Sequence, residues 1–184
     1  MVRKAEGEVG RFDRHQFMNI DTLPYDASLT TNLLPLHPAL IAFAKAALGA
    51  DDVHLYQAHT WAKFTGEADF DQPFHCDFGN HTLTVPADEP QLRTIDFIVY
   101  FTDVTDGHGA LHYVPKRDAF ELLGEGAVMA DAAAQPGLKA RERSAASPAG
   151  TVLAHGIDTF HRGTNLTLEG AHRYTMTVGY KARG

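Results

Sequence analysis

The residues best suited to chemistry in this chain are His75 and Asp77, which are separated by Cys76. Side chains alternate along a β-strand, so residues two apart point to the same side. On a strand, this pair would offer an imidazole and a carboxylate to one point, with Cys76 facing away. A second imidazole from a distant strand would complete a two-histidine, one-carboxylate set, which holds Fe(II) and leaves positions open for other ligands. Alone, the pair is more typical of a metal-free surface position.

Two histidines near the C-terminal end, His155 and His161, are candidates for the third ligand. Arg173 lies 12 residues after His161, at the start of an expected strand. A guanidinium group can hold the remote carboxylate of a keto diacid through two charge-assisted hydrogen bonds. The residues themselves leave both histidines open as ligands.

Composition restricts the class of protein that this site can belong to. A chain of 184 residues with 44% hydrophobic residues suits a single globular domain, residues 1–184. The net charge of −7 offers no basic surface for nucleic acid, and no apolar run approaches the about 20 residues of a membrane helix. Residues 1–14 contain no signal-peptide core, and the single cysteine excludes an internal disulfide. We therefore expect a cytoplasmic protein that binds neither nucleic acid nor membranes.

The expected secondary structure is mainly β. Residues 1–36 look irregular and 37–49 predict a helix, with Pro38 in its first turn and Gly49 at its end, so residues 1–52 form an irregular and helical lead-in. Short strands are expected at 53–64, 93–101, 110–114, 151–155 and 173–181. A short helix is expected at 118–123, and a loop with one helical turn at 130–147. Strands without regular helix alternation predict a β-sandwich or jelly roll with flanking helices.

The strand at residues 93–101 has two faces of different character. One face is apolar, whereas the other combines polar and aromatic groups; the members are Ile95, Phe97, Val99 and Phe101 on the first, and Thr94, Asp96, Ile98 and Tyr100 on the second. This alternation is typical of a strand that packs on a core with one side and lines a polar cavity with the other.

Four stretches of the chain, in this order, resemble the phytanoyl-CoA dioxygenase family of Fe(II)- and 2-oxoglutarate-dependent oxygenases. They are residues 56–63, residues 72–78 with the His-x-Asp motif, residues 101–115 with a glycine-rich turn, and residues 150–155 followed by 161–165 and Arg173. Together they span most of residues 53–181. The resemblance implies a double-stranded β-helix, a cupin-like jelly roll.

The resemblance also implies roles for individual residues. It selects His161 over His155 as the third iron ligand beside His75 and Asp77, and gives Arg173 the 5-carboxylate of 2-oxoglutarate. It places the strand at residues 53–64 near the cosubstrate or the substrate. We therefore expect Gln57 and Tyr100 to contact 2-oxoglutarate, and Trp61, Lys63 and His81 to contact the substrate. For each of these five residues, a role in packing or at the surface is an open alternative.

Two departures from the family pattern stand out. Gly163 occupies a position where the family often has a serine that helps to hold the cosubstrate, and Thr164 or Thr175 is a candidate to replace it. Residues 115–118 read Pro-Lys-Arg-Asp where the family often has Pro-Gly-Ser-His. Neither departure removes a predicted metal ligand.

The resemblance implies an enzyme that uses Fe(II), 2-oxoglutarate and dioxygen to hydroxylate a small or medium-sized metabolite, with release of succinate and CO2. Asp77 favours hydroxylation over halogenation, because related halogenases have a small residue in place of this carboxylate. Two alternatives are open: a degenerate jelly roll that binds a metal or ligand without oxidising anything, and a metal-dependent hydrolase or isomerase of the cupin type. Intact ligands and Arg173 argue against both.

Overall fold

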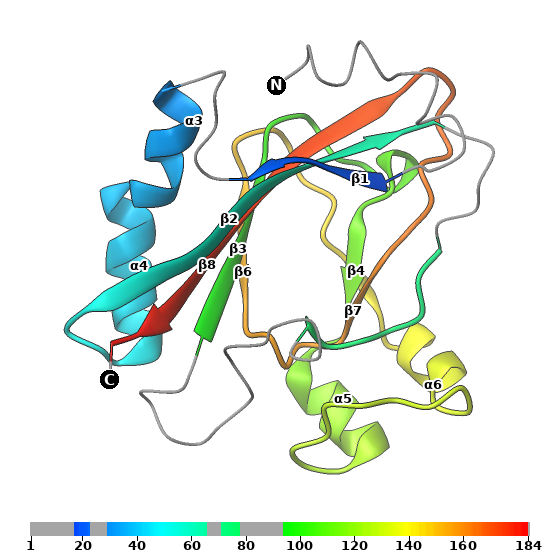
Figure 1. Cartoon of the computed structure of the whole chain (residues 1–184). Coiled ribbons are helices and arrows are strands. Elements are labelled where there is room, and N and C mark those ends of the chain that lie inside the picture. Colours follow the sequence, from blue (N-terminus) through cyan, green and yellow to red (C-terminus); the bar gives the residue numbers. More distant parts are fainter. Residues whose placement is uncertain (1–16, 23–28, 66–70, 78–93, 184) are drawn as a thin grey trace.

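The strands of the molecule form two antiparallel sheets. The computed structural model describes residues 17–22, 29–65, 71–77 and 94–183. Within them, a five-stranded sheet has the order β1-β2-β8-β3-β6 and a three-stranded sheet has the order β5-β4-β7 (Figure 1). The strands are β1 (Phe17–Thr22), β2 (Val53–Phe64), β3 (Thr94–Tyr100), β4 (Leu111–Tyr113), β5 (Arg143–Ser144), β6 (Val152–His155), β7 (His161–Gly163) and β8 (His172–Ala182). The prediction of a mainly β fold with flanking helices is confirmed.

Helices flank the sheets rather than alternate with the strands. They are α3 (Leu29–Leu33), η1 (Leu34–Leu36), α4 (Pro38–Leu48), η4 (Asp106–His108), α5 (Lys116–Leu123) and α6 (Gln135–Lys139). Helix α4 matches its sequence signals: the His37 side chain caps it by accepting from the Ala39 amide at 3.2 Å, and Gly49 ends it with a φ of 62°. No helix in the described part of the chain is long and apolar enough to cross a membrane.

Helix α4 covers the outer face of the large sheet (Figure 1). Its buried side chains Leu40, Ala44 and Leu48 pack in one cluster with Ile95, Phe97 and Val99 of β3 and with the buried apolar residues of β8. Burying a side chain the size of leucine or phenylalanine stabilises a fold by about 1.5–3 kcal/mol. The apolar face expected for β3 therefore anchors the sheet on α4, and its second face points toward the small sheet.

The N-terminal part differs from the expectation. Residues 1–36 look irregular in sequence, yet β1 and α3 lie within them. Strand β1 pairs antiparallel with β2 at the sheet edge, with a register shift between Asn19 and Asp21. Its partner strand lies over 30 residues away in the sequence, so no local pattern signals the pairing. The single-domain assignment for residues 1–184 stays a prediction.

Candidate metal centre and cosubstrate cavity

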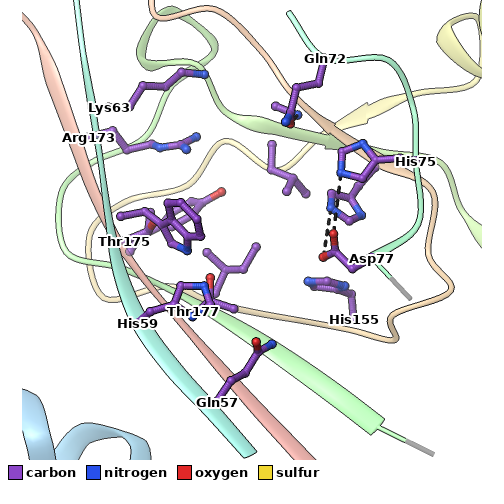
Figure 2. A pocket seen from close by; sticks show the side chains of 16 residues that line it. Gln57, His59, Lys63, Gln72, His75, Asp77, His155, Arg173, Thr175 and Thr177 are labelled. Atoms are coloured by element: carbon purple, nitrogen blue, oxygen red, sulfur yellow. Dashed lines mark hydrogen bonds and ion pairs between the residues drawn. The ribbon is translucent and has the colours of Figure 1, made fainter. Parts of the chain in front are cut away.

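The structure brings His75, Asp77 and His161 together. One ligand atom from each lies within 4.8 Å of the other two, so the three could hold a metal ion. The Asp77 carboxylate faces both rings, with Oδ2 3.4 Å from His161 Nε2 and Oδ1 3.7 Å from His75 Nε2 (Figure 2, dashed lines). Two imidazole nitrogens and a carboxylate on one side of an ion are the donor set expected for non-haem Fe(II).

The backbone fixes the two histidines relative to each other. His75 and His161 form an antiparallel bridge in which each amide donates to the other's carbonyl at 3.0 Å. The Asp77 amide then donates to the Ile157 carbonyl at 2.9 Å. The motif therefore sits on one β-bridge and not on the full strand expected from sequence. The predicted alternation still holds, because Cys76 is buried on the other side against Phe74, where burial raises the pKa of its thiol to about 12.

Two glutamine side chains hold the segment that carries the motif. Gln135, at the start of α6, accepts from the Phe74 amide at 2.7 Å and donates to its carbonyl at 3.1 Å. The backbone amide of Gln72 donates to the Gly163 carbonyl at 3.0 Å. Its side-chain oxygen accepts from the Gly163 backbone amide at 2.9 Å. These contacts tie both flanks of Phe74 and His75 to neighbouring elements. The sequence gives no signal for either role, because each depends on a partner far along the chain.

Hydrogen bonds prepare both histidine rings for a metal. His75 Nδ1 lies 2.9 Å from the Pro73 carbonyl, and His161 Nδ1 lies 2.9 Å from the Thr159 carbonyl. A carbonyl only accepts, so each Nδ1 carries the proton and each Nε2 keeps its lone pair toward Asp77. Burial lowers the pKa of the His161 imidazole below its ordinary value. The imidazole is therefore neutral at pH 7, which is the form that binds metal.

His155, the alternative third ligand, lies beside the group of three and not within it. Its ring centroid is 5.3 Å from that of His161, and its Nδ1 lies 3.1 Å from the Gly156 carbonyl. The geometry agrees with the choice of His161.

A polar cavity of about 390 Å³ adjoins the three ligands. The inward faces of β2, β8 and β3 form one wall, and residues of β4 and β7 form the other (Figure 2). Its lining residues are Gln57, His59, Trp61, Lys63, Gln72, His75, Asp77, Ile98, Tyr100, Leu111, His155, His161, Gly163, Arg173, Thr175 and Thr177. Ile98 and Tyr100 come from the face of β3 that was expected to line a cavity.

Two buried cations lie side by side at one end of this cavity. Lys63 and Arg173 are partners in the β2–β8 register and are 0% and 7% exposed. Lys63 Nζ donates to the Thr164 carbonyl and Arg173 Nη1 to the Gly109 carbonyl, both of which are neutral acceptors. Burial lowers the pKa of Arg173 to about 10. Burial and the Arg173 charge lower the pKa of Lys63 to about 7. A site of this kind favours an anion.

Gly109 permits the close packing beside Arg173. It adopts a φ of 71°, and a Cβ there would lie 2.6 Å from the Thr164 carbonyl oxygen. Only glycine fits such a position without displacing the backbone. The glycine-rich turn recognised in the sequence therefore brings the carbonyls of Gly109 and Thr164 next to the two cations.

The register of β2 changes the roles expected for Gln57 and Lys63. Both side chains face the cavity, but Lys63 pairs with Arg173 whereas Gln57 pairs with Gly179. Six residues along a strand separate them by about 20 Å, at about 3.3 Å per residue. The five-carbon diacid is far shorter than this. Lys63, expected at the substrate, thus lies at the Arg173 end, and Gln57, expected at the cosubstrate, lies at the opposite end.

The other predicted contacts are placed as follows. The ring of Tyr100 lines the cavity, but its hydroxyl donates to the Ala145 carbonyl at 3.1 Å, so its proton is used within the protein. Trp61 lines the cavity next to Lys63 and packs edge-on against His59, with ring centroids 4.8 Å apart. His81 lies outside the described residues.

Some cavity residues had no role assigned from the sequence. His59 lies between Gln57 and Trp61 in the alternation of β2, so the same period that selected its neighbours could have selected it. Thr175 lines the cavity beside Arg173, whereas the Thr164 hydroxyl donates to the Ala110 carbonyl at 2.7 Å. Of the two candidates to replace the family serine, Thr175 is therefore the better placed.

Comparison with known proteins identifies the family. The family model described as phytanoyl-CoA dioxygenase (PhyH) matches residues 5–170. The chain belongs to the phytanoyl-CoA dioxygenase family, as its motifs predicted. No curated protein matches the chain significantly.

Solved structures of iron- and 2-oxoglutarate-dependent enzymes share the fold. The epimerase SnoN, in complex with Fe3+, α-ketoglutarate and nogalamycin RO, is 19% identical over 98% of this chain and 74% of its own, with a TM-score of 0.65. The carbocyclase SnoK from nogalamycin biosynthesis is 19% identical over 98% and 73%, with a TM-score of 0.69. HygX from Streptomyces hygroscopicus, with nickel, 2-oxoglutarate and hygromycin B bound, is 16% identical over 98% and 78%, with a TM-score of 0.65.

Family and fold thus agree with the predicted cofactors, Fe(II) and 2-oxoglutarate, which are those of this enzyme class. The chain carries a group that could hold the metal. The similar enzymes catalyse different reactions, so the class does not define the outcome on the substrate.

Proposed function

We propose that this chain is a non-haem Fe(II)- and 2-oxoglutarate-dependent oxygenase that hydroxylates a small or medium-sized metabolite and releases succinate and CO2. The observation that carries the proposal is the cavity itself. Three convergent ligands, His75, Asp77 and His161, share it with two buried cations, Lys63 and Arg173. An ion site and an anion site in one cavity match a metal and a cosubstrate that has a carboxylate at each end.

The first group of residues in the cavity forms the metal site. His75, Asp77 and His161 hold the metal, and the carbonyls of Pro73 and Thr159 keep both Nε2 atoms available for it. Bound Fe(II) supplies the activation of dioxygen and the decarboxylation of 2-oxoglutarate. Holding three ligands on one side leaves the remaining positions for the cosubstrate and dioxygen.

Arg173 and Lys63 hold the remote carboxylate of 2-oxoglutarate, with Thr175 beside them. The guanidinium offers two parallel donors and Lys63 adds a third from the neighbouring strand. Gln57 faces the far end of the cavity, so we assign it to the substrate side. Its Nε2 donates to Asp96 at 3.0 Å, which fixes its orientation. Trp61 lies between the two ends and screens the cations from the substrate side.

The proposal is tested by adding Fe(II) and 2-oxoglutarate without oxygen. The weak visible charge-transfer band of the iron–2-oxoglutarate chelate should appear with the wild-type chain and be absent with Asp77→Ala, which should also lose iron-dependent succinate formation. Asp51→Ala, an exposed aspartate outside the cavity, is the matched control and should behave as wild type.

Bound metal without the band would support the binding-only alternative, and full turnover in Asp77→Ala would refute the assignment of the ligands. A cytoplasmic location, and a small-molecule substrate and dioxygen as partners without nucleic acid or membrane, belong to the same proposal.

A further inference from the structure

A second cavity of about 590 Å³ adjoins the metal site from another side. It lies where the edge strand β6 of the large sheet faces β4 of the small sheet, and we name it the seam chamber. Its wall includes Leu111, Tyr113, Pro115, Ala145, Leu153 and His155. Leu111, His155 and His161 also line the polar cavity, so the two spaces meet at these three side chains.

The seam chamber differs chemically from the polar cavity. Leucine, tyrosine, proline and alanine side chains supply most of its wall. Among the described residues that line it, Lys116 is the only one with a permanent charge, and its Nζ is paired with Asp158 Oδ2. An anionic group entering the chamber would therefore meet a cation that is already neutralised. A charge without a partner is costly to bury, whereas apolar surface gains from burial.

His155 stands at the junction of the two spaces. The Gly156 carbonyl occupies its Nδ1 at 3.1 Å, so Nε2 is the polar atom that the ring has for a ligand. Figure 2 shows the ring near Asp77, and its centroid is 5.3 Å from that of His161. His155 and the candidate ligand His161 both line the seam chamber, so a polar group bound there next to the metal site lies within the surroundings of His155.

We propose that the seam chamber binds an uncharged, mainly apolar group of the substrate, and that His155 hydrogen-bonds a polar atom next to that group. This inference rests on the proposed function, since it treats the metal centre as the place of reaction. It narrows the substrate class from any small metabolite to one with an uncharged ring or short hydrocarbon portion. A volume of about 590 Å³ lies within the range of natural ligand sites.

The test uses a matched pair of probes, 2-naphthol and 2-naphthoate, which share a ring system but differ in charge at pH 7. Each is titrated calorimetrically into the full chain alone, and again into the chain loaded with Zn(II) and 2-oxoglutarate. In the loaded chain, 2-oxoglutarate fills the anion site at Lys63 and Arg173, and we expect 2-naphthol to bind at least about tenfold more tightly than 2-naphthoate. In the chain alone we expect 2-naphthol to bind, whereas 2-naphthoate can also reach that anion site. Equal or tighter binding of 2-naphthoate to the loaded chain would overturn the inference, and this comparison needs no variant.

Leu153→Trp then locates the binding, because it fills the chamber from β6. This variant should lower the affinity for 2-naphthol at least about tenfold, because the probe can no longer bury its apolar surface there. Leu55→Trp is the control: Leu55 is also a partly buried leucine on a strand, but it packs against the α4 core. Unchanged affinity in a folded Leu153→Trp chain, or equal losses in both variants, would contradict the location.

The two proposals fail separately. Binding of 2-naphthol to the chain alone requires no metal. Such binding, weakened by Leu153→Trp, without an iron–2-oxoglutarate band would support the seam chamber while refuting the oxygenase. An iron–2-oxoglutarate band without tighter binding of 2-naphthol to the loaded chain would support the oxygenase while refuting the seam chamber.

Discussion

Two arginines, Arg162 and Arg173, are almost equally buried, at 6% and 7% exposed, but their surroundings are opposite. Arg162 points away from the cavity, on the outer face of the small sheet. Its Nε donates to Glu142 at 2.8 Å and its Nη1 to Asp71, and its guanidinium carbon lies 5.5 Å from the centre of the Phe74 ring. Arg173 points into the cavity, donates to the neutral Gly109 carbonyl and lies beside another cation.

The pKa values of the two groups reflect this difference. Burial alone lowers the pKa of a cation, yet Glu142 and Asp71 more than offset it for Arg162 and raise its pKa. Burial dominates for Arg173, whose pKa falls to about 10. Carboxylates thus stabilise the charge of Arg162, whereas burial has the largest influence on the pKa of Arg173. A pKa lowered by burial in a cavity is typical of a ligand site, so we assign Arg162 to the fold and propose Arg173 as the ligand contact.

The largest effect on stability is expected from Arg162→Met. The change leaves Glu142 and Asp71 without their shared cation, and breaking a buried pair in this way costs about 3 kcal/mol. Thermal or denaturant unfolding measures the loss. 2-Oxoglutarate binding should be nearly unchanged under conditions in which the variant is folded. A variant as stable as the wild type would show that this network does not hold the small sheet.

Arg173→Met should affect 2-oxoglutarate binding strongly and stability little. Removing a charge that is costly to bury should keep or raise the free energy of unfolding, whereas loss of the charge-assisted contacts should weaken 2-oxoglutarate about 100-fold, or about 2.7 kcal/mol. Quenching of the single tryptophan, Trp61, which lines the same cavity, reports the binding. Unchanged affinity in a folded Arg173→Met chain would remove Arg173 from the cosubstrate site.

Gly109→Ala tests the backbone that positions Arg173. A residue with a side chain is strained at a φ of 71°, and the added Cβ would meet the Thr164 carbonyl at 2.6 Å. We expect a loss of about 2 kcal/mol in the free energy of unfolding and weaker 2-oxoglutarate binding in the same variant. Gly150→Ala is the control, because Gly150 also has a positive φ, 86°, but nothing lies within 4 Å of its Cβ position. Equal binding losses in both variants would exclude a specific role for the Gly109–Thr164 contact.

Some features could be predicted from the sequence because their evidence is local, whereas the choice of His161 as third ligand rested on the family resemblance and stays a prediction. The His-x-Asp spacing, the alternation within β3 and the ends of α4 each depend on a few neighbouring residues. Strand β1 and the bridge between His75 and His161 depend on partners far along the chain, and no short window contains both sides of such a pairing.

The positions of Gln57 and Lys63 along the cavity could not be predicted for a related reason. Alternation along β2 shows correctly that both face the cavity, but it does not show which end of the cavity holds Arg173. That information lies in the register with β8, where Lys63 is opposite Arg173 and Gln57 is opposite Gly179. The sequence can therefore show which face of a strand points to a cavity without showing which end of the cavity each residue reaches.

Lys63→Met gives the smallest predicted effect on stability, and the size of this effect depends on pH. Burial and the Arg173 charge hold the pKa of Lys63 at about 7 in the folded chain, against 10.5 for an ordinary lysine. Between these values the unfolded chain binds more protons, so this group makes the wild type more stable as pH rises from about 7 to 10.5. Below pH 7 the folded chain bears a buried charge beside Arg173, which Lys63→Met removes.

The variant should therefore exceed the wild type in Tm at pH 6 by more than at pH 9. About 1 kcal/mol would change Tm by roughly 2–4 °C in a chain of this size. The matched control is Lys45→Met, because Lys45 on α4 is partly exposed. The Tm difference between this variant and the wild type should be the same at pH 6 and pH 9. A Lys63→Met chain that is less stable than wild type at pH 6 would mean that the ammonium group is neutralised in the fold. Lys63 would then resemble Arg162 and not Arg173.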